Sequence, residues 1–126
     1  MDTVALVPQD LADLIPVFLE NRREELEQLR HALRATDFGR LQHVGERMFA
    51  LGNPYGFRQI TTFGRQIREA CSVQDDATIG DIVEQYRGYL AKVAISLVPA
   101  PVERVRWNER PRADPDSMER LSARDG

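Results

Sequence analysis

The chain has 126 residues and a formal net charge of −3, enough for one domain with a single hydrophobic core. This charge gives no electrostatic footprint for nucleic acid, and no apolar run approaches the roughly 20 residues that cross a bilayer. The single cysteine, Cys71, excludes an intrachain disulfide and fits a cytoplasmic protein. The first residues include an early acid and no basic region, so we expect no secretory signal and no membrane attachment.

The first predicted helix covers about residues 14–35. Asp13 is a candidate N-cap, which places Pro16 in the first turn, where proline is tolerated because those amides lack intrahelical partners. A start at Gln9 or Asp10, with a break or kink before Pro16, is the alternative. Arg22 falls on the inward face, and we expect it to reach the bundle edge or to pair with an acid. The apolar residues at helical spacing on this inward face are Leu14, Ile15, Phe18, Leu26, Leu29 and Leu33.

The second predicted helix begins after Asp37, a favourable N-cap. Because a helix advances about 100° per residue, its faces follow from counting. Glu46 points almost directly away from the core face. His43 and Ala50 lie near it on the outer face, and Phe49 lies on the flank. The core face itself is formed by Leu41, Val44, Met48, Leu51 and Tyr55.

A turn at residues 52–56 leads into a third predicted helix over about residues 57–72. Gly64 inside this helix costs up to about 1 kcal/mol relative to alanine, so we expect it to allow close helix packing. Gly45 in the preceding helix lies beside the core face and has the same expected role. Cys71 belongs to the inner face and is predicted to be a small core residue. This face comprises Phe57, Ile60, Phe63, Ile67, Ala70 and Cys71.

A fourth helix is predicted over about residues 77–97, ended by the prolines that follow. Its inner face comprises Ile79, Ile82, Val83, Tyr86, Leu90, Val93 and Leu97. The remaining tail, residues 99–126, mixes charges of both signs with proline, so we expect mostly disorder, with residues 105–107 able to dock. No strand pattern competes with this interpretation. The predicted fold is therefore all-α, an antiparallel up-down-up-down four-helix bundle at residues 1–98 with a C-terminal tail.

Three segments carry a family resemblance: LIPVFLENRREELEQLRHALRATDFGRLQHVGERM, YGF and FGRQIREA. Over roughly residues 11–96, the chain resembles the histidine-containing phosphotransfer (HPt) family. The resemblance implies a four-helix bundle that acts with receiver domains in a bacterial or plant phosphorelay. The family signature, His-x-hydrophobic-Lys-Gly, lies in the middle of the second helix, and its histidine accepts the phosphoryl group.

The signature residues themselves are replaced in this chain. Alignment on the turn places Glu46 at the histidine position, Phe49 at the lysine position and Ala50 at the glycine position. A carboxylate is a weaker nucleophile than a neutral imidazole, and its negative charge repels an incoming phosphoryl group. Loss of the lysine also removes a cation that could stabilise the phosphate. The resemblance therefore implies a non-phosphorylatable, non-enzymatic module that binds a receiver domain or a histidine kinase.

His43 offers an alternative phosphosite. It lies one turn before Glu46 and about 60° away on the outer face. A shifted site would make the protein an active phosphotransferase, although Glu46 would then stand where the lysine is needed. A third hypothesis is a structural or self-associating helical bundle unrelated to signalling.

The outer face of the second helix is the predicted partner-binding surface. Phe49 on its flank can supply apolar contact area, or can instead fold back onto the bundle rim. We expect a monomer or a weak homodimer that binds no nucleic acid. The sequence contains no metal-ligand cluster, glycine-rich phosphate loop or nucleophile-base-acid set, so we expect neither a metal nor a cofactor. The predicted binding residues are Gln42, His43, Glu46, Phe49, Ala50 and Asn53.

Overall fold

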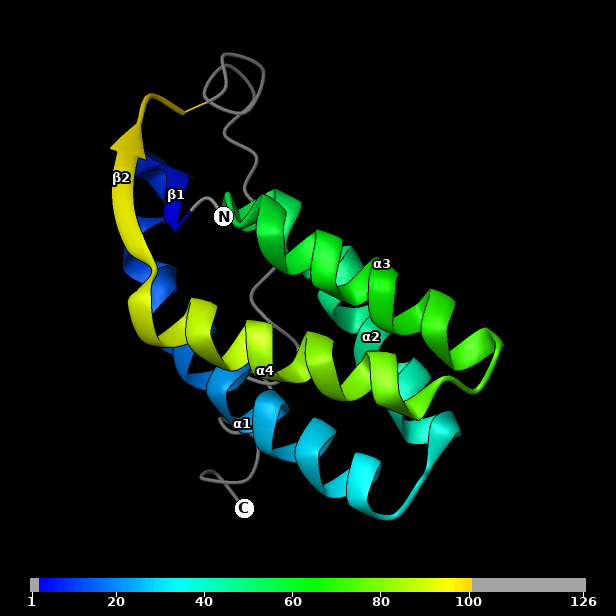
Figure 1. The fold of residues 1–126 in the computed structure, drawn as a ribbon. Helices are drawn as coiled ribbons and strands as arrows, with labels where there is room; N and C mark the ends of the chain where they lie inside the picture. The colour runs from blue at the N-terminus through cyan, green and yellow to red at the C-terminus, as the bar shows by residue number, and fades with distance from the viewer. Residues whose placement is uncertain (1–2, 101–126) are drawn as a thin grey trace, which may run out of the picture.

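The structure is a computed structural model that describes residues 3–100. This part of the chain is mostly helical, as predicted, and none of its helices has the length and apolar character of a membrane span. The elements in chain order are β1 (Val4–Pro8), the 3-10 helix η1 (Gln9–Leu14), α1 (Ile15–Arg34), α2 (Phe38–Leu51), the 3-10 helix η2 (Asn53–Tyr55), α3 (Arg58–Ser72), α4 (Asp76–Lys92) and β2 (Ala94–Val98) (Figure 1). The predicted docking segment at residues 105–107 lies outside the described residues.

Each α-helix packs against two others. α1 contacts α2 and α4, and α3 contacts the same two helices, so α1 lies beside α4 and α2 beside α3 (Figure 1). Their inner faces meet in one buried cluster, which includes Cys71, as predicted. Burial raises the pKa of the Cys71 thiol. Predicted core residues that the structure buries include Phe18, Leu29, Leu41, Val44, Met48, Ile60, Phe63, Ile67, Ile79 and Tyr86.

The starts of the first two helices differ in how they are capped. Asp37 caps α2 as predicted, because its Oδ1 accepts a hydrogen bond from the Arg40 N–H at 3.1 Å. The prediction of Asp13 as the cap of α1 was wrong. The N-cap of α1 is Leu14, which makes no side-chain cap, because the chain enters α1 directly from η1. Pro16 lies in the first turn, as expected.

Two glycines allow α2 and α3 to approach closely. A Cβ on Gly64 would lie 2.5 Å from the carbonyl oxygen of Gly45 and would also overlap the backbone nitrogen of Phe49. A Cβ on Gly45 would lie 3.0 Å from Cγ2 of Ile67. Backbone atoms cannot move aside as a flexible side chain can, so only glycine fits at residue 64. This contact confirms the predicted role of Gly64 and brings the flank of α2 against α3.

A cluster of buried polar side chains joins α1 to α4. Arg22 is fully buried and pairs with Glu25, with 3.3 Å between Nε and Oε1, and its guanidinium lies 4.8 Å from the ring centroid of Phe18. The Tyr86 hydroxyl of α4 donates to Glu25 Oε1 at 3.2 Å. Burial, and secondarily the charge of Glu25, hold the pKa of Tyr86 well above its usual range. Of the two alternatives expected for Arg22, the pairing with an acid is the one that the structure shows, and the side chain is buried and not at an edge.

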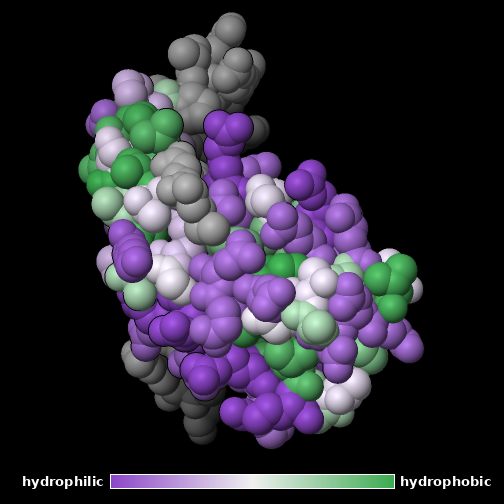
Figure 2. All heavy atoms as spheres, in the orientation of Figure 1, coloured by the Kyte–Doolittle hydropathy of each residue, from purple (hydrophilic) through white to green (hydrophobic). Residues whose placement is uncertain are grey.

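The two strands correct the expectation that the chain contains none. β1 and β2 form a parallel two-stranded sheet in which Val4 is opposite Ala94 and Pro8 is opposite Val98. The predicted fourth helix was therefore too long, since α4 ends at Lys92 and the segment after it is extended. The spacing of the apolar residues near the end of α4 imitates a helical face, whereas the strand exists only through its distant partner. Hydrophobic side chains gather over these strands at the upper left of the surface view (Figure 2).

Candidate functional site

The six predicted binding residues lie on one exposed side of α2 and of the turn that follows it. Each of them is exposed, whereas the opposite stripe of α2 is buried in the core. The predicted helical register of α2 is therefore confirmed. We call this surface the α2 face; it comprises Gln42, His43, Glu46, Phe49, Ala50 and Asn53.

Glu46 presents its carboxylate to solvent in the middle of α2. Its nearest described partner is Gln42, one turn earlier, whose Nε2 donates to Glu46 Oε1 at 3.4 Å. This long contact joins two exposed side chains, so the Glu46 carboxylate remains accessible to solvent. The centre of the α2 face therefore carries a carboxylate, which can accept hydrogen bonds from a partner.

Phe49 meets a cation that was not among the predicted site residues. The guanidinium carbon of Arg68, on α3, lies 4.4 Å from the centroid of the Phe49 ring, within the range of a cation–π contact. Phe49 remains 38% exposed, so it is partly packed and partly available for contact. A sequence signal for Arg68 did exist, because it lies one turn after Gly64, the residue of α3 that touches α2. The α2 face thus has a positive charge at its flank, supplied by the neighbouring helix.

Thr61 anchors the end of α2 to α3. Its hydroxyl donates to the carbonyl of Phe49 at 3.1 Å and accepts from the backbone N–H of Asn53 at 2.8 Å. The Phe49 carbonyl lies in the last turn of α2, where carbonyl groups lack intrahelical partners, and Asn53 is the first residue of η2. One side chain therefore holds Phe49 and Asn53 in position, and helical periodicity in the sequence did not identify it.

His43 lies exposed on the α2 face, one turn before Glu46. Among the residues that the structure describes, no group hydrogen-bonds to its imidazole. The same residues contain no cluster of three or more side chains placed to hold a metal ion. The exposure of His43 leaves its imidazole accessible to a partner.

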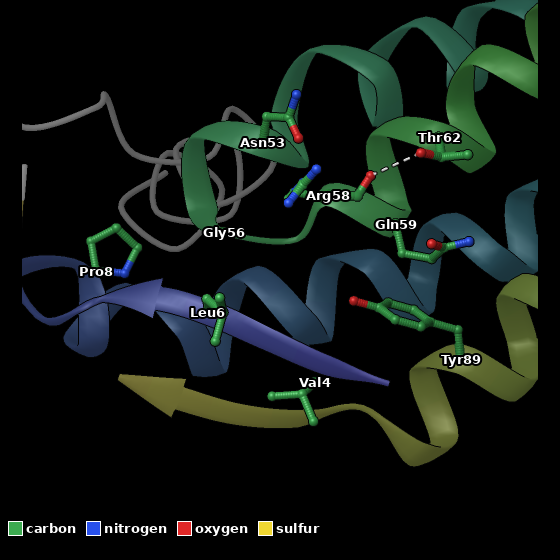
Figure 3. Close-up of a pocket in the computed structure, with 9 residues that line it drawn as sticks. All are labelled: Val4, Leu6, Pro8, Asn53, Gly56, Arg58, Gln59, Thr62 and Tyr89. Atoms are coloured by element: carbon green, nitrogen blue, oxygen red, sulfur yellow. Dashed lines mark hydrogen bonds between the residues drawn. The ribbon is translucent and has the colours of Figure 1, made fainter. Parts of the chain in front are cut away.

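A groove of about 490 Å³ adjoins the α2 face at Asn53 (Figure 3). Apolar side chains from β1, including Leu6, line one wall, and the first turns of α3 line the other. Arg58 is its charged lining residue, and Tyr89 reaches it from α4 (Figure 3). The groove was not predicted, because it depends on a strand that the sequence did not reveal. The full lining comprises Val4, Leu6, Pro8, Asn53, Gly56, Arg58, Gln59, Thr62 and Tyr89.

Comparisons of the chain with models of protein families, with curated proteins and with solved structures gave no match. The HPt resemblance therefore stands on the sequence segments given above. The function is argued below from those segments together with the geometry of the α2 face.

Proposed function

We propose that this protein is a non-phosphorylatable HPt-like module of a two-component pathway. It acts in the cytoplasm by binding a receiver domain or a histidine kinase through the α2 face. The observation that carries the proposal is the position of Glu46, an exposed carboxylate in the middle of α2, where the resemblance expects the phosphoacceptor histidine. An exposed helix centre is accessible to a partner, and the residue found there is a poor phosphoryl acceptor.

The proposal includes the architecture of the family, an antiparallel up-down-up-down bundle. Two features support it. The connections between consecutive helices are short, at residues 35–37, 52–57 and 73–75, and short loops favour antiparallel neighbours. The helix contacts also form a closed cycle, from α1 to α2, α3, α4 and back to α1.

The chemistry of the α2 face suits binding better than group transfer. Glu46 supplies a hydrogen-bond acceptor, and Arg68 adds a guanidinium beside the Phe49 ring. Full burial of a phenylalanine contributes about 1.5–3 kcal/mol, and Phe49, which is 38% exposed, can gain roughly 0.5–1 kcal/mol of this on binding. Apolar contact alone is therefore too small for a stable complex, so the charged groups have to contribute as well.

The test combines phosphoryl transfer with binding. The purified chain is mixed with receiver domains from the same organism that have been phosphorylated by acetyl phosphate, and acid-labile phosphate on the chain is measured. We expect none. Calorimetry then measures receiver affinity for the wild type, Phe49→Lys and Glu46→Ala, with Gln85→Ala on the exposed side of α4 as the control. Both α2 variants should bind more weakly, and Gln85→Ala should bind as the wild type does.

Unchanged affinity in both α2 variants would place the interface elsewhere on the molecule. The exposure of His43 on the same face favours one second candidate, an active phosphotransferase. Acid-labile phosphate that appears on the wild type and disappears in His43→Gln would establish that candidate and refute the non-phosphorylatable module.

A further inference from the structure

The strand β2 has an unusual combination of exposure and composition. Its sequence, AISLV, contains no charged residue and no proline. All five residues are at least partly exposed, with Ile95 at 40% and Leu97 at 53%. β2 also forms the outer margin of the molecule, with β1 on its inner side (Figure 1). An apolar edge strand without charges is a ready template for pairing with another strand.

The hydrogen-bonding groups of this outer edge can be assigned. The N–H of Ala94 donates to the carbonyl of Thr3 at 2.8 Å, so the peptide groups of Ala94 face β1. Successive residues of a strand direct these groups to opposite edges, so Ile95 and Leu97 direct theirs outward. Within residues 3–100 the sheet has only two strands, and nothing in that range hydrogen-bonds to the outer edge.

The side chains of the same two residues extend the core-facing side of the sheet. The register places Ile95 opposite Ala5 and Leu97 opposite Val7, and paired residues of parallel strands point to the same face. Ala5 and Val7 are buried, whereas their partners on β2 are half-exposed. The core-facing side of the sheet is therefore only partly covered at β2. A further strand paired with β2 would bury more of Ile95 and Leu97.

We propose that this further strand is β2 of a second copy of the chain, paired antiparallel about Ser96. Independently of the function proposed above, this assigns a homodimer interface to β2. In this register Ile95 lies opposite the second copy's residue 97, and the outward groups of these two residues exchange both of their hydrogen bonds. The two-fold symmetry repeats the pair, which gives four hydrogen bonds and two apolar side-chain pairs.

A second copy is compatible with the absence of charge on β2 and with a small, reversible interface. The chain carries a net charge of −3, and a charge-free strand lets two identical chains meet without like charges in contact. A register centred on Ile95 or on Leu97 would form only one hydrogen-bonded pair, so the arrangement about Ser96 is preferred. Two five-residue strands bury much less than the roughly 800 Å² per partner of a stable complex, so the dimer is reversible, with a dissociation constant on the order of 100 µM.

Disulfide trapping tests the register. Ser96 faces its own copy as a non-hydrogen-bonded pair with Cα atoms about 4.5 Å apart, inside the range of a disulfide. Ile95→Cys lies diagonal to its copy at about 7–8 Å, beyond that range. Under oxidised glutathione, Ser96→Cys should yield covalent dimer several times faster than Ile95→Cys or Ser72→Cys, a matched exposed serine at the end of α3. Equal yields from the three variants would overturn the proposal.

Sedimentation velocity of the full chain tests the interface. The wild type should show a rising sedimentation coefficient with concentration, and Leu97→Lys should raise the dissociation constant at least tenfold. Val73→Lys makes the same change at an exposed residue between α3 and α4 and should leave the constant unchanged. A concentration-independent monomer would overturn the proposal. So would hydrogen exchange that finds the Ile95 and Leu97 amides protected at every concentration, since another part of the same chain would then cover the edge.

Discussion

The contacts α1–α4 and α2–α3 use opposite means to hold helices together. α1 and α4 are joined through long polar side chains, with Arg22 and Glu25 buried and tied to Tyr86. α2 and α3 are joined through missing side chains, with Gly45 and Gly64 in backbone contact. The first contact depends on the pairing of buried charged and polar side chains, and the second on the absence of a Cβ atom. The second also brings α3 close enough to supply a cation to the α2 face.

The largest expected effect comes from the α1–α4 contact. Glu25→Ala removes the carboxylate that lies 3.3 Å from the buried Arg22 guanidinium. Removal of one partner of a buried ion pair typically costs about 3–5 kcal/mol. Denaturant unfolding should show this loss. Arg87→Ala, which removes an exposed pair with Glu84, is the control and should change stability by less than about 1 kcal/mol.

The next effect tests the α2–α3 contact. Gly64→Ala places a Cβ against backbone atoms of α2, and such overpacking costs about 1–3 kcal/mol even though alanine has the better helix propensity. A matched control exists in α4, where a Cβ on Gly88 would meet nothing within 4 Å. Gly88→Ala should therefore stabilise the fold by about 0.5–1 kcal/mol. If the melting temperatures of both variants changed in the same direction relative to the wild type, the close contact would not be a requirement of the fold.

A smaller effect belongs to the hydrogen bond between Tyr86 and Glu25. Tyr86→Phe keeps the ring and removes a donor to a carboxylate, so a loss of about 1–2 kcal/mol is expected near neutral pH. Burial raises the folded-state pKa of Tyr86 above the value near 10 of an unfolded tyrosine. The contribution of this hydroxyl is fully present below pH 10 and is lost as the pH rises toward the folded-state pKa. Unfolding measured from neutral pH upward should show the difference between wild type and variant shrinking above about pH 10.

The smallest effect lies on the surface beside the α2–α3 contact. The cation–π contact between Arg68 and Phe49 is partly exposed and should contribute about 0.5–1 kcal/mol. A double-mutant cycle of Arg68→Gln and Phe49→Leu, followed by chemical unfolding, isolates this term. A coupling energy near zero would show that the ring and the guanidinium act independently on the α2 face.

Local sequence patterns predicted which residues of α2 are buried and which are exposed on the α2 face. The 3.6-residue period alone separates Val44 and Met48, which are buried, from Glu46, which is exposed. Asp37 is recognisable as a cap because capping needs only a short side chain and the next turn. Arg68 and Thr61 escaped prediction, since each acts on α2 from another helix and neither interrupts the pattern of its own.

The sequence by itself determined where the helices lie, apart from the end of α4, which side of each is buried and which groups the α2 face exposes. These properties follow from interactions within one or two helical turns, so spacing along the chain reports them. Only the tertiary structure decided that Glu25 is buried against Tyr86, that Arg68 covers Phe49 and that residues 94–98 form a strand. In each case the partner lies far away in sequence, and a strand in particular acquires its hydrogen bonds only when the fold brings its neighbour alongside.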